Sequence, residues 1–165
     1  MPRRWAHTQG VADQAAALST VLGADSELVV ASAWLHDIGY SPSLVSTGFH
    51  PLDGARYLRD VERADELLCS LVAHHTGALV EADERGLRDE LAGEFALPPE
   101  PLLDALTYSD LTTGPDGSRL TVEERLSEIL DRYGPDDLVH RAITRSSPAL
   151  RGTVRTVEKR RANAR

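Results

Sequence analysis

The chain is patterned for helices along almost its whole length, and this pattern restricts the fold more than any other feature of the sequence. Apolar residues recur three and four positions apart in nearly every segment, which is the spacing that gives an α-helix one buried face. No stretch of four or more residues alternates apolar and polar side chains with the β-branched enrichment of a strand. We therefore predict an all-α fold, a helical bundle of about seven helices.

The expected helices follow from this periodicity and from local start and stop signals. They cover residues 9–22, 27–35, 50–58, 64–74, 86–95, 102–111 and 122–133, with a last stretch from Asp136. Ser26 is the expected N-cap of the second helix, and His50-Pro51 opens the third, since proline suits a first turn. Thr121 and Glu124 form a capping box before the helix at residues 122–133.

Two segments are expected to separate these helices. Residues 75–86 are expected to be a loop, and residues 113–118 (TGPDGS) a polar turn. The last helical stretch is expected to break near residues 146–148 (SSP), because proline removes a backbone donor inside a helix. We therefore expect a principal domain at residues 1–135 and a helical extension with a basic tail at residues 136–165.

Charge is distributed unevenly along the 165 residues. The formal net charge of −8 combines a tail of +5 at residues 151–165 with a body of −13 at residues 1–150. A nucleic-acid backbone is bound by continuous basic surface, so the acidic body argues against a long nucleic-acid polymer as the substrate. The basic tail is expected to be a solvated helix end.

Length and composition indicate a globular protein of the cytoplasm. A chain of 165 residues suits one domain with its own core, and 41% hydrophobic residues is a globular composition. No apolar run approaches the roughly 18 residues of a membrane span, and residues 1–10 lack the apolar core of a signal peptide. The single cysteine, Cys69, excludes an internal disulfide. We expect no membrane partner, and a homodimer is left open because bundles of this size often dimerise.

Histidine and aspartate side chains gather at the expected helix ends. Five of the six histidines lie in the first 75 residues, whereas His140 has no acidic or histidine partner at ligand spacing. His36 and Asp37 are adjacent where the second helix ends, in AWLHDIGY. Neighbours on a regular helix point about 100° apart, but at a helix end, where Gly39 releases the backbone, both can turn toward one ion. We therefore predict a metal site where helix ends converge.

Seven side chains are candidate metal ligands: His7, His36, Asp37, His50, His74, His75 and Asp110. They divide into two sets that share Asp37. His7, His36 and Asp110 complete the first set, and His50 with His74 or His75 completes the second. Nitrogen and oxygen ligands that leave open positions suit Fe, Mn, Ni, Co or Mg better than a closed structural zinc site. The sequence therefore predicts one or two divalent ions.

These ligands stand in the order of a known family signature, which runs His, then His-Asp, then a distant Asp. His7, the pair His36-Asp37 and Asp110 follow that order, and HDIG is a common form of the central motif. The chain therefore resembles the HD superfamily of metal-dependent phosphohydrolases. The resemblance implies an all-helical HD domain, which we assign to residues 1–135.

The resemblance extends to two further segments and covers about residues 3–130. HPLDGARYL at residues 50–58 is similar to the His-Pro…Gly-Ala segment of members that bind two metals. LVAHHTGA at residues 71–78 is similar to their later histidine block.

The later histidine block resembles more than one subfamily. His75-Thr76 with Gly77 resembles a block of HD-type symmetrical dinucleoside tetraphosphate hydrolases. The tandem His74-His75 resembles cyclic-di-GMP phosphodiesterases of the HD-GYP group, but residues 76–84 contain no GYP. The order of ligands is also similar to that of mixed-valence diiron oxygenases of the superfamily. The substrate stays open, as does the choice between His74 and His75 as the ligand.

The resemblance implies hydrolysis of a phosphate ester by a metal-activated water. His36 and Asp37 are the expected catalytic residues, with Asp37 bridging two ions. Arg3, Arg4 and Arg56 are candidates for binding the substrate phosphate, and Arg56 is the closest of them in sequence to a metal-site residue. We expect a small phosphorylated metabolite or nucleotide as the substrate.

Two other functions are compatible with the same residues. The first is a mixed-valence diiron oxygenase that oxidises a C–H bond of a small substrate. The second is a regulatory module that has lost catalysis, although a site that keeps all its ligands argues against such a loss.

Overall fold

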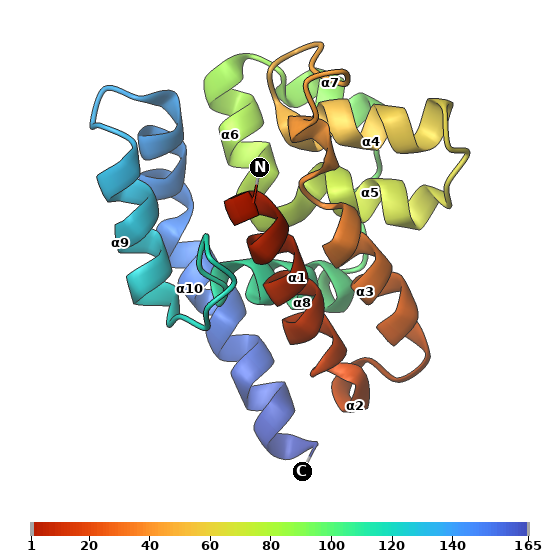
Figure 1. Ribbon diagram of the computed structural model, residues 1–165, viewed down its shortest axis with the longest axis vertical. Coiled ribbons are helices and arrows are strands. Elements are labelled where there is room, and N and C mark those ends of the chain that lie inside the picture. The colour runs from red at the N-terminus through yellow and green to blue at the C-terminus, as the bar shows by residue number, and fades with distance from the viewer. Residues whose placement is uncertain (1, 165) are drawn as a thin grey trace.

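The computed structural model describes residues 2–164, and over these residues the chain forms ten α-helical segments and three short 3-10 helices, with no strand (Figure 1). The α-helices are α1 (Pro2–Ala16), α2 (Ser19–Leu22), α3 (Ser26–Leu35), α4 (His50–Asp60), α5 (Glu66–His74), α6 (Ala78–Arg85), α7 (Arg88–Glu94), α8 (Glu100–Leu111), α9 (Val122–Arg132) and α10 (Leu138–Asn163). The 3-10 helices are η1 (Gly23–Asp25), η2 (Ile38–Tyr40) and η3 (His75–Gly77). The all-α prediction is confirmed, and the additional helical segments are short.

α1 begins well before the predicted start at residue 9 and contains His7. His7, Val11 and Ala15 are spaced four residues apart, and all three are buried along one face of the helix. Because His7 is polar, the sequence pattern does not show that the buried face extends to this residue. The prediction of one helix over residues 9–22 is therefore wrong at its start, and it misses the break between α1, which ends at Ala16, and α2, which ends at Leu22.

Residues 78–85 form α6, so the prediction of a loop over residues 75–86 is wrong. Ala78 and Ala82, one turn apart, are the buried residues of α6 and give only a weak periodic signal. Gly77 and Gly86 bound the helix with φ values of 74° and 71°. Glycine adopts this left-handed backbone without steric cost, which lets the chain turn sharply at both ends.

α10 continues unbroken through Pro148, so the predicted break there is wrong. The helix packs against α6, α8 and α9, and Leu150 and Val154 are buried in that contact. The packing of the helix on both sides of Pro148 stabilises it and offsets the free-energy cost of the backbone hydrogen bond that proline cannot make. The division of the chain near residue 135 stays a prediction.

The helix starts agree with the sequence signals at two of three positions. The capping box of Thr121 and Glu124 at α9 and the start of α4 at His50 are confirmed. Ser26 is the first residue of α3 and not its N-cap, and Asp25 at that position makes no capping hydrogen bond through its side chain. The reason is that η1 runs directly into α3, so no extended residue precedes the helix.

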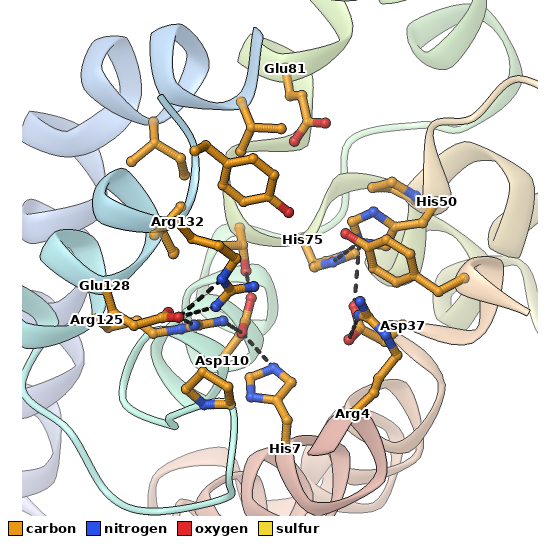
Figure 2. Close-up of a pocket in the computed structure, with 18 of the residues that line it drawn as sticks. Arg4, His7, Asp37, His50, His75, Glu81, Asp110, Arg125, Glu128 and Arg132 are labelled. Atoms are coloured by element: carbon orange, nitrogen blue, oxygen red, sulfur yellow. Dashed lines mark hydrogen bonds and ion pairs between the residues drawn. The ribbon is translucent and has the colours of Figure 1, made fainter. Parts of the chain in front are cut away.

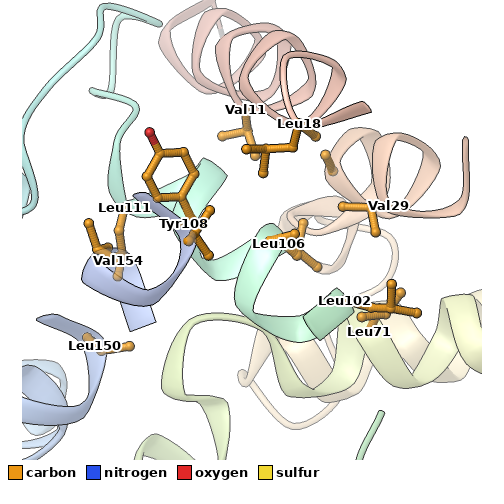
Figure 3. Close-up of a cluster of buried hydrophobic side chains, with 14 of the residues drawn as sticks. Val11, Leu18, Val29, Leu71, Leu102, Leu106, Tyr108, Leu111, Leu150 and Val154 are labelled. Atoms are coloured by element: carbon orange, nitrogen blue, oxygen red, sulfur yellow. The ribbon is translucent and has the colours of Figure 1, made fainter. Parts of the chain in front are cut away.

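Two clusters of buried side chains hold the helices together. The larger joins α1, α3, α8, α9 and α10, with Val11, Val29 and Val154 among its members (Figure 3). The smaller joins α4 to α7. α5 belongs to both, through Leu71 in the larger and Val72 in the smaller, and therefore fixes them relative to each other.

Among residues 2–164 no single helix is long and apolar enough to cross a membrane. The helical segments Arg3–Ala16 and Ser19–Tyr40 meet the length and composition criteria only as a pair, and they are bent by 53° relative to each other.

The predicted polar turn after α8 packs closely against α1. A Cβ atom on Gly10 would lie 2.8 Å from the carbonyl oxygen of Gly117, and one on Gly117 would lie 2.5 Å from that of Ala6. Only glycine permits this approach of two backbones, and the φ of 82° at Gly117 favours glycine as well. The contact places the carbonyl oxygen of Gly114 3.0 Å from Nδ1 of His7.

Candidate metal centre

Three histidines donate a hydrogen bond to the backbone through the same ring nitrogen. The Nδ1 atoms of His7, His36 and His75 lie 3.0, 2.7 and 2.7 Å from backbone carbonyl oxygens. For His36 and His75 the acceptor is the carbonyl three residues earlier, in the last turn of the preceding helix. Because a carbonyl oxygen only accepts, each Nδ1 carries the proton. In its neutral form each ring would present an Nε2 lone pair, as metal-binding histidines do.

His7, His36 and Asp37 form the first ligand group, in which one atom from each residue lies within 4.8 Å of the others. His36 is fully buried, and its Nε2 has no hydrogen-bond partner among residues 2–164. Oδ1 of Asp37 lies 3.6 Å from that nitrogen. Asp110 lies beside the group, with its Oδ1 3.1 Å from Nε2 of His7. The structure thus brings together the four residues of the first predicted set.

Asp37, His50 and His75 form the second ligand group, again within 4.8 Å of one another (Figure 2). Nε2 of His50 lies 3.4 Å from Oδ1 of Asp37 and 3.2 Å from Nε2 of His75. Burial lowers the pKa of both histidines, so both rings are neutral near pH 7. Two ring nitrogens at this distance need a proton or a cation between them, since two lone pairs repel.

His74 joins neither group, although it was a candidate ligand. Its Nε2 donates a hydrogen bond to the carbonyl oxygen of Phe95 at 2.8 Å, and the side chain is buried. α5 ends at His74, and the change of backbone direction in η3 turns His75 toward Asp37. The two adjacent histidines therefore differ in their contacts. His74 makes a buried hydrogen bond to the backbone, and His75 faces the candidate metal centre.

Arg4 closes the remaining side of Asp37. Its Nη1 lies 2.7 Å from Oδ2 of Asp37, and its guanidinium carbon lies 3.5 Å above the ring centre of Tyr40. The Tyr40 ring stacks on His50, with centroids 4.0 Å apart and an angle of 18°. Burial alone would raise the pKa of Asp37, but the nearby imidazoles of His36 and His50 and the guanidinium of Arg4 hold it well below its usual value. Asp37 is therefore a carboxylate at any ordinary pH.

Asp110 is fixed by groups from three elements. Thr76 donates a hydrogen bond from its Oγ1 to Oδ2 at 2.6 Å, and Nη2 of Arg125 lies 3.7 Å from Oδ1. Burial would raise the pKa of Asp110, but the hydrogen bond and charge of His7 keep it well below its usual value. For His7, burial would lower the pKa, and Asp110 raises it overall. Thr76 has a φ of 47°, which is an outlier for a β-branched residue.

The two ligand groups open into a cavity of about 420 Å³. Four arginines line it: Arg3, Arg4, Arg125 and Arg132. Glu128 pairs with both Arg125 and Arg132 and holds them at the wall (Figure 2). The volume is that of a site for a small molecule. The lining thus places four arginines beside the histidine cluster, together with four carboxylates, Asp37, Glu81, Asp110 and Glu128.

A family model described as the HD domain matches residues 4–136 of the chain. The chain belongs to the HD domain family. The resemblance deduced from the order of His7, His36-Asp37 and Asp110 is thereby confirmed, and it places the protein in a superfamily of metal-dependent phosphohydrolases.

Two curated proteins match parts of this HD domain protein. A tRNA (cytidine(56)-2'-O)-methyltransferase of Thermoplasma volcanium is 36% identical over 94 residues, which is 57% of this chain and 25% of that protein. A ribonuclease Y of Rubrobacter xylanophilus is 33% identical over 70 residues, which is 42% of this chain and 14% of that protein. The chain thus spans a quarter or less of the length of these relatives. No solved structure is significantly similar to it.

The donor atoms of this HD domain fit a divalent metal. The buried Nε2 of His36 has no hydrogen-bond partner among residues 2–164. A buried polar atom without a partner lowers the stability of the fold, and a bound metal ion would remove that cost. The remaining donors are imidazole nitrogens and carboxylate oxygens without a thiolate, since Cys69 lies in the smaller core cluster. This set suits first-row divalent ions and Mg²⁺.

Tyr40, Thr76 and Arg125 contact the candidate ligands of the HD domain site and were not predicted from the sequence. Thr76 follows the histidine pair directly, so its position gave a signal that could have been used. Arg125 gave none, because a charged residue on an amphipathic helix is normally solvated. It is only 8% exposed because α9 packs over the cavity.

The structure separates the three candidate phosphate-binding arginines. Arg3 and Arg4 line the cavity. Arg56 lies on α4 six residues after His50 and faces α7, where it pairs with Glu90 and Glu94. The prediction that Arg56 binds substrate is therefore corrected, because sequence proximity to His50 does not place a side chain on the same helix face.

Replacing Arg4 or Arg56 with alanine is expected to separate these roles. Arg56→Ala removes a partly exposed pair, so we expect kcat/KM for a phosphate ester to stay within about twofold. Arg4→Ala removes the partner of Asp37 and a cation of the cavity, so we expect a loss of about 10–100-fold. Steady-state kinetics on the two variants measure this difference, and equal losses would contradict it.

Replacing His74 or His75 with alanine is expected to separate metal binding from stability. His75→Ala should lower the metal content, because it removes a ligand atom of the second group. His74→Ala should leave the metal content unchanged and lower the free energy of unfolding by about 1–3 kcal/mol, because the carbonyl of Phe95 loses its buried donor. Elemental analysis and urea denaturation give the two readings. Metal loss in His74→Ala alone would reverse the assignment.

Proposed function

We propose that this HD domain protein is a metal-dependent phosphohydrolase that acts on a small phosphorylated metabolite or nucleotide. The observation that carries the proposal is the position of two ligand groups sharing Asp37 at one end of a cavity lined by arginines. A phosphate ester is the substrate whose charge matches that combination.

His7, His36, Asp37 and Asp110 would hold one divalent ion, and Asp37, His50 and His75 a second. Such ions lower the pKa of a bound water and polarise a phosphoryl oxygen. The hydrogen bonds from Nδ1 to backbone carbonyls fix three of the four histidine rings, those of His7, His36 and His75. Thr76 fixes the carboxylate of Asp110 in the same way.

The arginines of the cavity orient the phosphate. Arg125 and Arg132 are held at the wall by Glu128, so little side-chain entropy is lost when they bind an anion. Arg4 is held in place by Asp37 and Tyr40. Guanidinium groups bind phosphate oxygens in a bidentate manner, which fixes the direction of the scissile bond.

A small substrate agrees with the cavity and with the charge of the protein. The volume of about 420 Å³ holds one small molecule. The body of the chain, residues 1–150, has a net charge of −13, which repels a polyanion outside the cavity. The name of the matched ribonuclease Y refers to cleavage of RNA, and we propose that this chain shares with it the phosphate-ester bond class and not the polymeric substrate.

The proposal is tested by measuring phosphate release from a panel of nucleoside and sugar phosphates under nitrogen, with Mn²⁺, Mg²⁺, Fe²⁺, Co²⁺ or Ni²⁺ added in turn. We expect at least one ester to be hydrolysed. His36→Gln is the matched variant, because it removes the Nε2 ligand at a buried site, and it should lower kcat/KM by more than about 100-fold. No release with any ion, or full activity of His36→Gln, would rule the proposal out.

A mixed-valence diiron oxygenase is the second candidate. The second ligand group favours it, because a hydrolase that uses one metal has no need of His50 and His75 beside Asp37. An oxygenase would consume dioxygen in the presence of iron and its substrate and would be inactive under nitrogen. Hydrolysis under nitrogen with Mg²⁺ or Mn²⁺ excludes this candidate.

A further inference from the structure

One end of the cavity is apolar. Four side chains form it: Ile129 of α9, Tyr133 directly after α9, and Val139 and Ile143 of α10. Ile129 and Ile143 are each 8% exposed and belong to the larger core cluster, against which Tyr133 and Val139 also pack. This end of the cavity is therefore a firm apolar wall, which suits an apolar part of a ligand.

Ion pairs connect α10 to α6 beside the wall. Nε of Arg141 lies 3.1 Å from Oε2 of Glu84, and Nη2 of Arg145 lies 2.8 Å from Oδ2 of Asp83. These pairs join α10 to α6 beside the cavity, and the two helices also pack directly. The apolar wall is thus preformed, so a ligand that binds there loses little free energy in ordering it.

One carboxylate faces the cavity at this end. Glu81 of α6 lines the cavity and lies in Figure 2 at the end of the view opposite His7. Its Oε1 accepts hydrogen bonds from Nε and Nη2 of Arg85 at 2.8 and 2.7 Å, and its Oε2 accepts none from residues 2–164. The side chain is 19% exposed. A carboxylate oxygen only accepts, so it suits a ligand group that donates, such as an amino group.

The two ends of the cavity therefore differ in chemistry. Metal ligands, Arg4 and Arg125 lie at one end, and an apolar wall with Glu81 lies at the other, where the guanidinium carbon of Arg132 is 5.8 Å from the ring centre of Tyr133. We propose that the second end binds an aromatic ring carrying an amino group, joined to the phosphate held at the first end. Tyr133 provides the ring face for this contact, and Glu81 accepts the hydrogen bond of the amino group. This inference rests on the proposed function, since it assigns the phosphate to the metal end.

The test uses three phosphonates that cannot be hydrolysed: methylphosphonate, benzylphosphonate and 4-aminobenzylphosphonate. Each is titrated by calorimetry into the full chain loaded with Mn²⁺. Benzylphosphonate is expected to bind about tenfold more tightly than methylphosphonate, because it buries a ring. The amino group is expected to add about a further threefold through Glu81.

Two variants assign the gains to residues. Tyr133→Ala should remove the gain from the ring and leave methylphosphonate binding unchanged, whereas Glu81→Gln should remove only the gain from the amino group. Tyr57→Ala is the matched control, because this tyrosine lies on α4 and bonds to Glu62, outside the cavity lining. It should keep all three affinities.

The outcomes separate this inference from the proposed function. Equal affinity for all three phosphonates would overturn the ring site, while binding of methylphosphonate that requires Mn²⁺ would leave the proposed function standing. Gains that survive in both Tyr133→Ala and Glu81→Gln would also overturn it. No binding of any phosphonate, together with no ester hydrolysis, would contradict both.

Discussion

Replacing Asp37 with alanine is expected to abolish phosphate-ester hydrolysis and to remove metal from both ligand groups. Asp37 is the residue common to the two groups. Its Oδ1 lies 3.6 Å from Nε2 of His36 and 3.4 Å from Nε2 of His50. Changes to outer partners of metal ligands typically cost 10–100-fold in affinity or activity, so we expect loss of this shared ligand to lower kcat/KM by more than about 10³-fold. Phosphate release and elemental analysis of the same preparation give both readings.

Asp53→Asn is the matched control for Asp37→Ala. Asp53 is also a buried carboxylate, 3% exposed, but it accepts hydrogen bonds from the backbone of residues 46–48 and does not line the cavity. The control variant is expected to lose stability and to keep its metal. If Asp37→Ala kept both its metal and its activity, Asp37 would not belong to the centre.

Replacing Gly39 with alanine is expected to destabilise the fold and to displace His50. A Cβ atom at Gly39 would lie 2.1 Å from the carbonyl oxygen of His50 and 2.7 Å from the backbone nitrogen of Gly54. Both neighbours are backbone atoms of α4, so the whole helix must move. Overpacking typically costs 1–3 kcal/mol, and we expect about 3 kcal/mol here, with a lower affinity for metal at the second group. Urea denaturation and metal titration measure the two effects.

Gly93→Ala is the control for this substitution. Gly93 lies in α7, and a Cβ atom there would meet nothing within 4 Å. Alanine is the better helix former, so this variant should gain about 0.5–1 kcal/mol. A stable Gly39→Ala protein with unchanged metal binding would mean that the close approach of η2 to α4 has no role in the centre.

Gly39 also shows where sequence reasoning reached the correct residue for a different reason. We expected this glycine to release the backbone so that His36 and Asp37 could turn toward one ion. In the structure it permits close contact with the start of α4, and that contact brings His50 to Asp37. The sequence could not reveal this, because the contact joins residues that are neighbours only in the folded chain.

The side chains that gather in the two groups could largely be predicted, because they share a chemistry and an order that the HD signature describes. The tandem His74-His75 could not be resolved, because adjacent side chains near a helix end point in different directions that depend on the residue at which the helix stops. α5 stops at His74, and that one boundary decides which ring meets His50.

The fold was predictable as a class and less so in its boundaries. Helical spacing indicated an all-α chain, and the missed features have particular causes. α6 presents only Ala78 and Ala82 to the core, and α10 passes Pro148 because tertiary packing outweighs a local cost. Arg125 was missed for a similar reason, since its burial depends on where α9 lies and not on its own sequence context.

The most direct test of the metal centre is the metal content per chain, measured by elemental analysis of protein purified without added metal or chelator. Two groups that share Asp37 predict about two divalent ions per chain, or uptake to that number when Mn²⁺ or Fe²⁺ is supplied. Absence of metal, with no uptake on addition, would contradict the assignment of these histidines and aspartates as ligands.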